Sequence, residues 1–125
     1  MTYDMFNEMA LNNITVPCAG GQTVSSIGGW MQGGGFSILA SRFGLMADHV
    51  LSLEVVTADG RFVHATVDGD KALQELFFAI RGGGPSTCSI LTCLLMLIPM
   101  SRQLRYRNFS HYQSPRPHLH LKLQL

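Results

Sequence analysis

Hydrophobic residues recur every three to four positions in two stretches of the chain, which predicts two amphipathic helices. In residues 2–11, Met5 and Met9, like Phe6 and Ala10, stand four apart, and Asn12-Asn13 follows as a stop signal. Residues 71–80 place four apolar side chains on one stripe, Leu73, Leu76, Phe77 and Ile80. Asp68 and Asp70 precede this second helix as N-cap candidates, and the sequence RGGGP at 81–85 ends it.

A period of two, typical of half-buried strands, appears between these helices. Residues 51–55 and 63–67 alternate apolar and polar positions, and Asp59-Gly60 between them predicts a hairpin turn. Two uninterrupted apolar runs, 14–17 and 89–97, predict a short strand and a buried strand. The order of helix, strand, loop, two strands, helix and strand predicts an α+β fold with antiparallel pairing.

Residues 20–35, GGQTVSSIGGWMQGGG, hold seven of the thirteen glycines and the single tryptophan. Glycine supplies no side chain to pack, so this density predicts a loop that either lies against a ligand or serves as a flexible linker. Two common phosphate-binding signatures are absent. No lysine follows a glycine pair as a P-loop requires, and GGGFSI at 33–38 lacks the last glycine of a dinucleotide-binding turn.

Composition limits the classes of function. The chain has 125 residues, enough for one domain, with 46% hydrophobic and 14% charged residues. A net charge of +1 gives no reason to expect a nucleic-acid or membrane partner. The N-terminus has early acids and no apolar signal-peptide core, and the apolar run 89–100 is shorter than the ~20 residues of a membrane span. Cys18, Cys88 and Cys93 lack CxxC spacing and are interpreted as ordinary thiols.

Catalytic and metal-binding constellations are sparse. Asp48 and His49 are expected to point to opposite faces of a strand, and His64 is expected to be solvated on the polar face of its strand. The pair His118-x-His120 has no third ligand and is interpreted as part of a basic tail. The tail arginines are interspersed with the aromatic residues Tyr106, Phe109 and Tyr112. Such a pattern allows stacking on the bases of single-stranded nucleic acid, so nucleic-acid binding is an alternative function. The sequence predicts no metal site and no nameable catalytic residue.

Five blocks in order resemble the FAD-linked oxidases of the vanillyl-alcohol oxidase and berberine-bridge-enzyme type, in particular the fungal members. They are TVSSIGGWMQGGG at 23–35, GLMADHVL at 44–51, EVVTADG at 54–60, LFFAIRGGG at 76–84 and ILT at 90–92. The resemblance covers residues 2–92. It implies a fragment of a PCMH-type FAD-binding domain, namely its second subdomain, with an antiparallel sheet and flanking helices. It also implies that full-length members act on small-molecule substrates and are often secreted.

The resemblance also implies a cofactor site. FAD would lie along a backbone whose glycines let N–H groups approach flavin and phosphate oxygens. The residues implied are Thr23, Val24, Ser25, Ser26, Gly28, Gly29, Gln32, Gly33, Gly34, Phe36 and Ile90. Gly21 stands where some members carry a flavin-linking cysteine, so non-covalent binding is expected. The chain differs from the family pattern at three further positions. Ser25 replaces a glycine, Phe36 replaces a histidine or tyrosine, and His49 replaces an asparagine. The RGGG at 81–84 is interpreted first as a structural turn.

The chain changes character after Thr92, where the family pattern stops. We expect a partial FAD-binding domain over residues 1–92 and a divergent basic tail over 93–125. Codons for residues 96–102 read one nucleotide out of frame can encode AYPDVP, the continuation typical of the family. The tail is therefore hypothesised to be frame-shifted or to lack a selected fold, although LHLKLQL at 119–125 alternates like a strand. Two functions stay open: a fragment of an FAD-dependent oxidase, or a non-catalytic remnant that binds FAD weakly or not at all.

Overall fold

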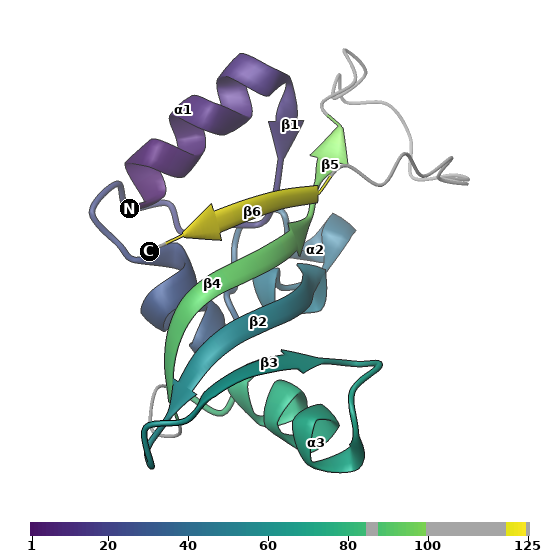
Figure 1. The fold of residues 1–125 in the computed structure, drawn as a ribbon. Helices are drawn as coiled ribbons and strands as arrows, with labels where there is room; N and C mark the ends of the chain where they lie inside the picture. Colours follow the sequence, from purple (N-terminus) through teal and green to yellow (C-terminus); the bar gives the residue numbers. More distant parts are fainter. Residues whose placement is uncertain (85–87, 100–119, 125) are drawn as a thin grey trace.

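The computed structural model describes residues 1–84, 88–99 and 120–124 and has the expected mixture of helices and antiparallel strands (Figure 1). The first helix, α1, spans Thr2–Asn12 and buries Thr2, Met5 and Met9, and Asn13 ends it with a φ of 52°. β1 then covers only Ile14–Thr15 and pairs with β5, Ile98–Pro99. This strand is shorter than the predicted 14–17, and Pro17 has no N–H to donate to a longer ladder.

The main sheet has four antiparallel strands in the order β3-β2-β4-β6. They are β2 (Val50–Thr57), β3 (Phe62–Thr66), β4 (Cys88–Met96) and β6 (His120–Gln124). The predicted hairpin joins β2 to β3, and Gly60 turns it with a φ of 81°. The buried strand expected at 89–97 is β4, which lies between β2 and β6. The alternating pattern therefore located β2 and β3, and the uninterrupted apolar run located β4.

The second predicted helix is α3, Lys71–Ile80, with the bounds that its pattern predicts. The Asp70 side chain accepts a hydrogen bond of 3.0 Å from the backbone N–H of Leu73, which confirms it as the N-cap. Phe77 and Ile80 are buried, and α3 packs against β3. The helix ends at Arg81, and Gly82 and Gly84 carry φ values of 133° and 80° through the turn that follows.

The glycine-rich segment is helical over much of its length, so the prediction of a loop there is wrong. Ser26–Trp30 forms a π-helical turn, η1, and Met31–Gly33 forms a 3₁₀ turn, η2. The Ser25 hydroxyl accepts a hydrogen bond of 3.2 Å from the N–H of Gly28 and caps the first turn. Ile27 and Met31, four residues apart, are buried together in the core. This i, i+4 apolar pair outweighs the low helix propensity of the glycines.

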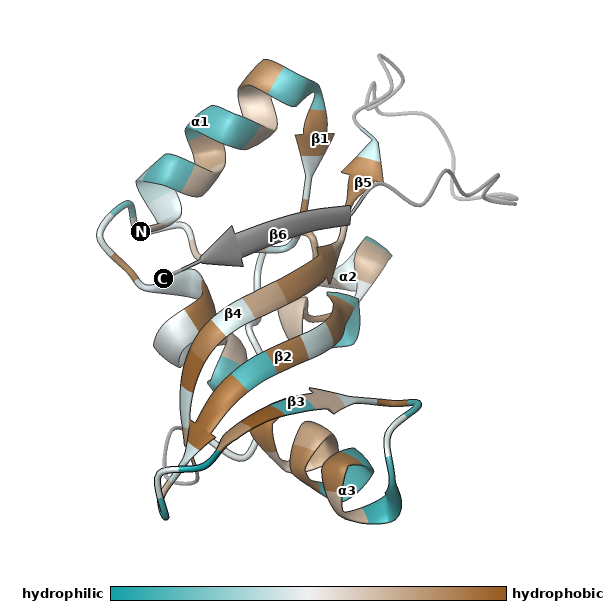
Figure 2. Cartoon of the chain, viewed as in Figure 1, coloured by the Kyte–Doolittle hydropathy of each residue, from teal (hydrophilic) through white to brown (hydrophobic). Residues whose placement is uncertain are grey.

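Two further short elements complete this part of the chain, α2 (Ala40–Phe43) and the 3₁₀ turn η3 (Met46–His49). They lie with η1 and η2 behind the sheet in Figure 1, whereas the other sheet face is turned to the viewer. Figure 2 shows apolar and polar residues alternating along β2 and β4. Leu53 and Val55 of β2 are fully buried on the covered face and share one core with Met31 and Met46.

The boundary expected between residues 92 and 93 lies within β4. Beyond it, Cys93, Leu95 and Leu97 are buried in the core. The interpretation of 93–125 as a frame-shifted tail stays a prediction, and residues 100–119 and 125 lie outside the described residues. Within the described part of the chain, none of the helices has the length and apolar character needed to cross a membrane.

Candidate functional site

Three segments distant in sequence meet around the helical turns of the glycine-rich segment. The N–H of Gly84 donates to the carbonyl of Gln32 at 2.9 Å. The N–H groups of Met46 and Ala47 donate to the carbonyls of Gly35 and Gly34 at 3.0 and 3.2 Å. Backbone hydrogen bonds therefore join residues 28–35, 44–47 and 81–84 into one unit, here named the glycine wall.

The glycines of this wall fall into two groups. Gly34 and Gly35 have φ values of 98° and 75°, and a Cβ on Gly35 would lie 2.6 Å from Cβ of Met46, so the fold itself requires glycine at 35. Gly29 and Gly33 are exposed, lie outside the positive-φ region, and a Cβ on either would meet no atom within 4 Å. The fold does not require glycine at 29 or 33. Their lack of side chains leaves the backbone accessible at these two positions.

The residues expected to bind cofactor do not all face solvent. Thr23, Ser25 and Phe36 are exposed and Val24 is partly buried, whereas Ser26 and Ile90 are buried. The Ser26 hydroxyl lies 2.6 Å from that of Thr2 and anchors the turn to α1. The Ser25 side chain caps its own helical turn. Ile90 belongs to β4, which packs against η1, so these predicted residues gather on adjoining elements.

Two buried polar atoms of the wall lack a hydrogen-bond partner. Gln32 is almost fully buried, and its Nε2 donates to the Gly28 carbonyl at 2.6 Å, but its Oε1 has no partner. Nε of Arg81 is also buried without a partner. Among the described side chains these are the two such atoms, and both belong to segments that the Gly84–Gln32 hydrogen bond joins. Unpartnered buried polar atoms are rare in folded proteins.

The two cysteines at positions 18 and 93 are buried thiols. Cys18 is buried, and this burial raises the pKa of its thiol to about 11. Burial likewise raises the pKa of Cys93 to about 12. Both are therefore protonated at neutral pH and are poor nucleophiles. Gly21, at the expected attachment position, carries no side chain.

His49 corrects one expectation from the sequence. Asp48 and His49 lie in the 3₁₀ turn η3 and not in a strand, so the reasoning from opposite strand faces was wrong. His49 is buried, and its two ring nitrogens contact the carbonyls of Phe43 at 2.9 Å and Met96 at 3.2 Å. Asp48 accepts a hydrogen bond of 2.8 Å from the N–H of Leu45. His49 thus connects the turn before β2 with the end of β4, which is a structural role.

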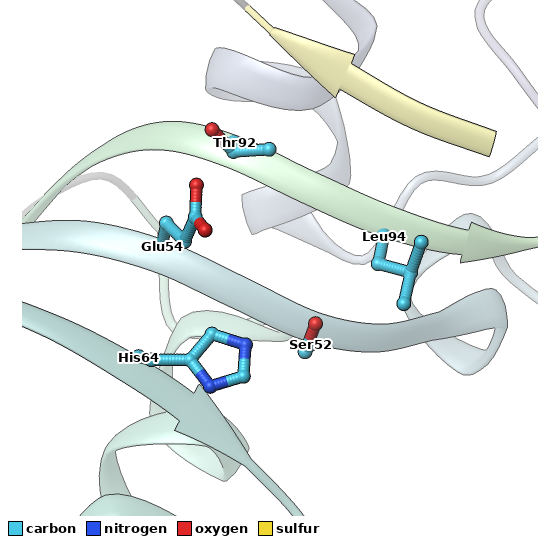
Figure 3. Close-up of a pocket in the computed structure, with 5 residues that line it drawn as sticks. All are labelled: Ser52, Glu54, His64, Thr92 and Leu94. Atoms are coloured by element: carbon cyan, nitrogen blue, oxygen red, sulfur yellow. The ribbon is translucent and has the colours of Figure 1, made fainter. Parts of the chain in front are cut away.

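His64 is exposed, as predicted, on the uncovered face of the sheet. It lines a shallow hollow of about 170 Å³ with Glu54, Ser52, Thr92 and Leu94 (Figure 3). No group of three or more histidine, cysteine or acidic side chains is arranged for a metal ion among the described residues. Tyr106, Phe109, Tyr112 and His118 lie outside the described residues. The hollow and the glycine wall occupy opposite faces of the sheet.

Comparison with known proteins decides the family. A family model described as an FAD binding domain matches residues 2–66, just over half of the chain. The chain belongs to this family of FAD-binding domains. It is 48% identical over 69 residues to the VAO-type flavoprotein oxidase VAO615 of Thermothelomyces thermophilus, covering 55% of this chain and 12% of that protein. It is 41% identical over 90 residues to aurantioclavine synthase of Penicillium expansum, covering 71% of this chain and 19% of that protein.

Solved structures show the same relationship at the level of fold. The VAO-type flavoprotein MtVAO615 of Myceliophthora thermophila aligns with a TM-score of 0.71 and 36% identity, over 78% of this chain and 17% of its own. A berberine-bridge-like protein of Physcomitrella patens aligns with a TM-score of 0.67 and 30% identity, over 77% and 20% of the two chains. The predicted resemblance and α+β fold are thereby confirmed. The chain spans a fifth or less of these relatives.

Sequence reasoning missed the contribution of Arg81 to the wall. The sequence RGGG indicated a helix stop, and that prediction is correct. It did not indicate the Gly84–Gln32 hydrogen bond, which brings this turn against a residue 52 positions earlier in the chain. A glycine run directly after a helix, in a chain with a second glycine run, is the signal that could have suggested the juxtaposition.

Proposed function

We propose that the glycine wall forms one side of an FAD site in a flavin-dependent oxidoreductase of the oxidase type. The observation that carries the proposal is the exposed backbone at Gly29 and Gly33, where the fold tolerates a side chain but none is present. Such a surface suits close approach by a flat or anionic ligand. The membership of the chain in a family of FAD-binding domains supports FAD as that ligand.

The residues of the wall fit this cofactor in complementary ways. Exposed backbone at 29 and 33 permits contact at van der Waals distance. Exposed Phe36 adds an apolar side chain at the end of the segment. Bound FAD would supply the redox chemistry, accepting a hydride from a substrate carbon and passing electrons to oxygen. The chain's own contribution is to bind and orient it.

The proposed binding mode is non-covalent. No cysteine stands at position 21, and the raised pKa of Cys18 keeps its thiol protonated at neutral pH. We further propose a small organic molecule as substrate, supported by the VAO-type oxidase among the relatives.

Substitution of the open glycines tests this site. In Gly29→Ala and Gly33→Ala, the added methyl group meets no protein atom and raises helix propensity by about 1 kcal/mol, so the free energy of unfolding should hold or rise. The same methyl group would stand between the backbone and FAD. We expect affinity, followed by quenching of flavin fluorescence, to fall about tenfold, or 1.4 kcal/mol.

Gly20→Ala is the matched control, because its Cβ also meets nothing and its φ is ordinary, but it precedes the expected cofactor residues. FAD affinity should be unchanged in this variant. Equal affinity in all three variants and the unchanged protein would contradict a site at Gly29 and Gly33.

A further inference from the structure

His49 contacts two backbone carbonyls at once, although it is almost fully buried, with 4% of its surface exposed. Its Nε2 lies 2.9 Å from the carbonyl oxygen of Phe43, the last residue of α2. Its Nδ1 lies 3.2 Å from the carbonyl oxygen of Met96, the last residue of β4. The ring therefore bridges α2 and the end of β4, which lie beside each other (Figure 1).

The protonation state of the ring decides how many of these contacts are hydrogen bonds. A carbonyl oxygen only accepts, so each ring nitrogen must carry a hydrogen in order to bond to it. A neutral imidazole carries a hydrogen on one nitrogen, and its other nitrogen would turn a lone pair toward a carbonyl oxygen. The imidazolium form carries hydrogens on both nitrogens and donates to both carbonyls. The geometry around His49 is therefore fully satisfied by the protonated ring.

The ionisable side chains on the surrounding elements make no contact with the ring. Among the described residues, no ion pair includes His49. Arg42 of α2 is exposed, and Arg81 at the end of α3 donates to a carbonyl of η3. Asp48 is exposed and accepts a hydrogen bond from a backbone N–H. In β4 the thiol of Cys93 is uncharged, because burial raises its pKa to about 12. The two carbonyl oxygens are thus the described groups that can stabilise a charge on this ring.

We propose that His49 is a pH-sensitive connection between η3 and the end of β4, which protonation of its ring strengthens. Burial by itself opposes a charged ring, because it removes the charge from water. Two charge-assisted hydrogen bonds offset this cost, whereas the neutral ring leaves one buried carbonyl facing a lone pair. Folding therefore favours the protonated ring. The free energy of unfolding consequently falls as the pH rises through the range of about 5 to 8 in which histidine loses its proton.

The test measures urea unfolding of the full chain at several pH values between about 5.5 and 8, the range in which histidine titrates. For the unchanged protein, we expect the folding equilibrium constant to fall about tenfold across this range, which corresponds to about 1.4 kcal/mol. His49→Asn and His49→Gln carry an amide that does not titrate, so both variants should lose most of this pH dependence.

Two other histidines provide the matched controls. His64 is exposed on the uncovered face of the sheet, and His120 stands opposite Met96 in the register of β4 and β6. His64→Gln and His120→Gln should keep the pH dependence of the unchanged protein, because both leave the two contacts of His49 in place.

Nitrogen-15 spectra of the unchanged protein with labelled histidine decide the matter even if both His49 variants fail to fold. At a pH of about 5.5, within the titration range of histidine, we expect one ring with both nitrogens protonated and with hydrogens that exchange slowly with water, because His49 is buried. A slowly exchanging ring protonated on a single nitrogen at this pH would overturn the inference. Equal losses of stability at every pH in the His49 variants would also contradict it and leave a structural role that is independent of pH. None of these measurements requires FAD, so their result is independent of the proposed function.

Discussion

A chain ending at Thr92 should not fold, although the family pattern in the sequence stops there. The cut removes the second half of β4, which lies in the middle of the sheet, together with β5 and its pairing to β1. Leu95 and Leu97, exposed by 0% and 4%, leave the core, and each such side chain contributes about 1.5–3 kcal/mol. The hydrogen bond between His49 and the Met96 carbonyl is also lost. These losses approach the ~5–15 kcal/mol that stabilise a typical domain.

The control is a chain ending at Pro99, which keeps β4 and β5 and, like the shorter chain, lacks β6. We expect this chain to show native-like circular dichroism and a cooperative urea transition, whereas the shorter chain shows neither. Equal unfolding midpoints for the two chains would contradict the packing of residues 93–97 in the core. That result would instead support a domain boundary at residue 92.

Gly35→Ala should destabilise the fold by roughly 2–5 kcal/mol. The backbone at Gly35 has a φ of 75°, where a residue with a side chain costs about 1–2 kcal/mol. The new methyl carbon would also lie 2.6 Å from Cβ of Met46, which is fully buried and cannot move without disturbing the core. Overpacking of this kind costs about 1–3 kcal/mol. Urea denaturation followed by circular dichroism measures the sum.

Gly33→Ala provides the comparison within the same glycine run. Its Cβ meets no atom and its φ is ordinary, so the free energy of unfolding should not fall. A similar loss of stability in both variants would show that the distinction between structural and exposed glycines is wrong. The two substitutions therefore test the interpretation of the wall without any ligand.

The periodic patterns predicted those helices and strands whose conformation depends on their own side chains. The stripe ending in Phe77 and Ile80, with Asp70 as cap, gave α3 its bounds, and alternation with Asp59-Gly60 gave the β2–β3 hairpin. Both depend on contacts within one element or between neighbours in sequence. The family blocks likewise identified the FAD-binding domain correctly.

Features that depend on distant contacts were not predictable from the same patterns. The segment 26–33 was expected to be a loop because glycine disfavours helix, yet burial of Ile27 and Met31 against the sheet makes it helical. The structural role of His49 depends on the contact of its ring with the carbonyl of Met96, which lies 47 residues later in the chain. Arg81 joined the wall through a hydrogen bond made by Gly84. Each of these roles requires the assembled fold.

The central claim, that the glycine wall binds FAD without a covalent bond, is tested most directly by mixing the purified chain with FAD and desalting it. We expect the folded protein to keep the flavin absorbance, and acid precipitation to leave the flavin in the supernatant. A colourless protein with a native circular dichroism spectrum would contradict binding, and flavin remaining with the acid precipitate would contradict the non-covalent mode.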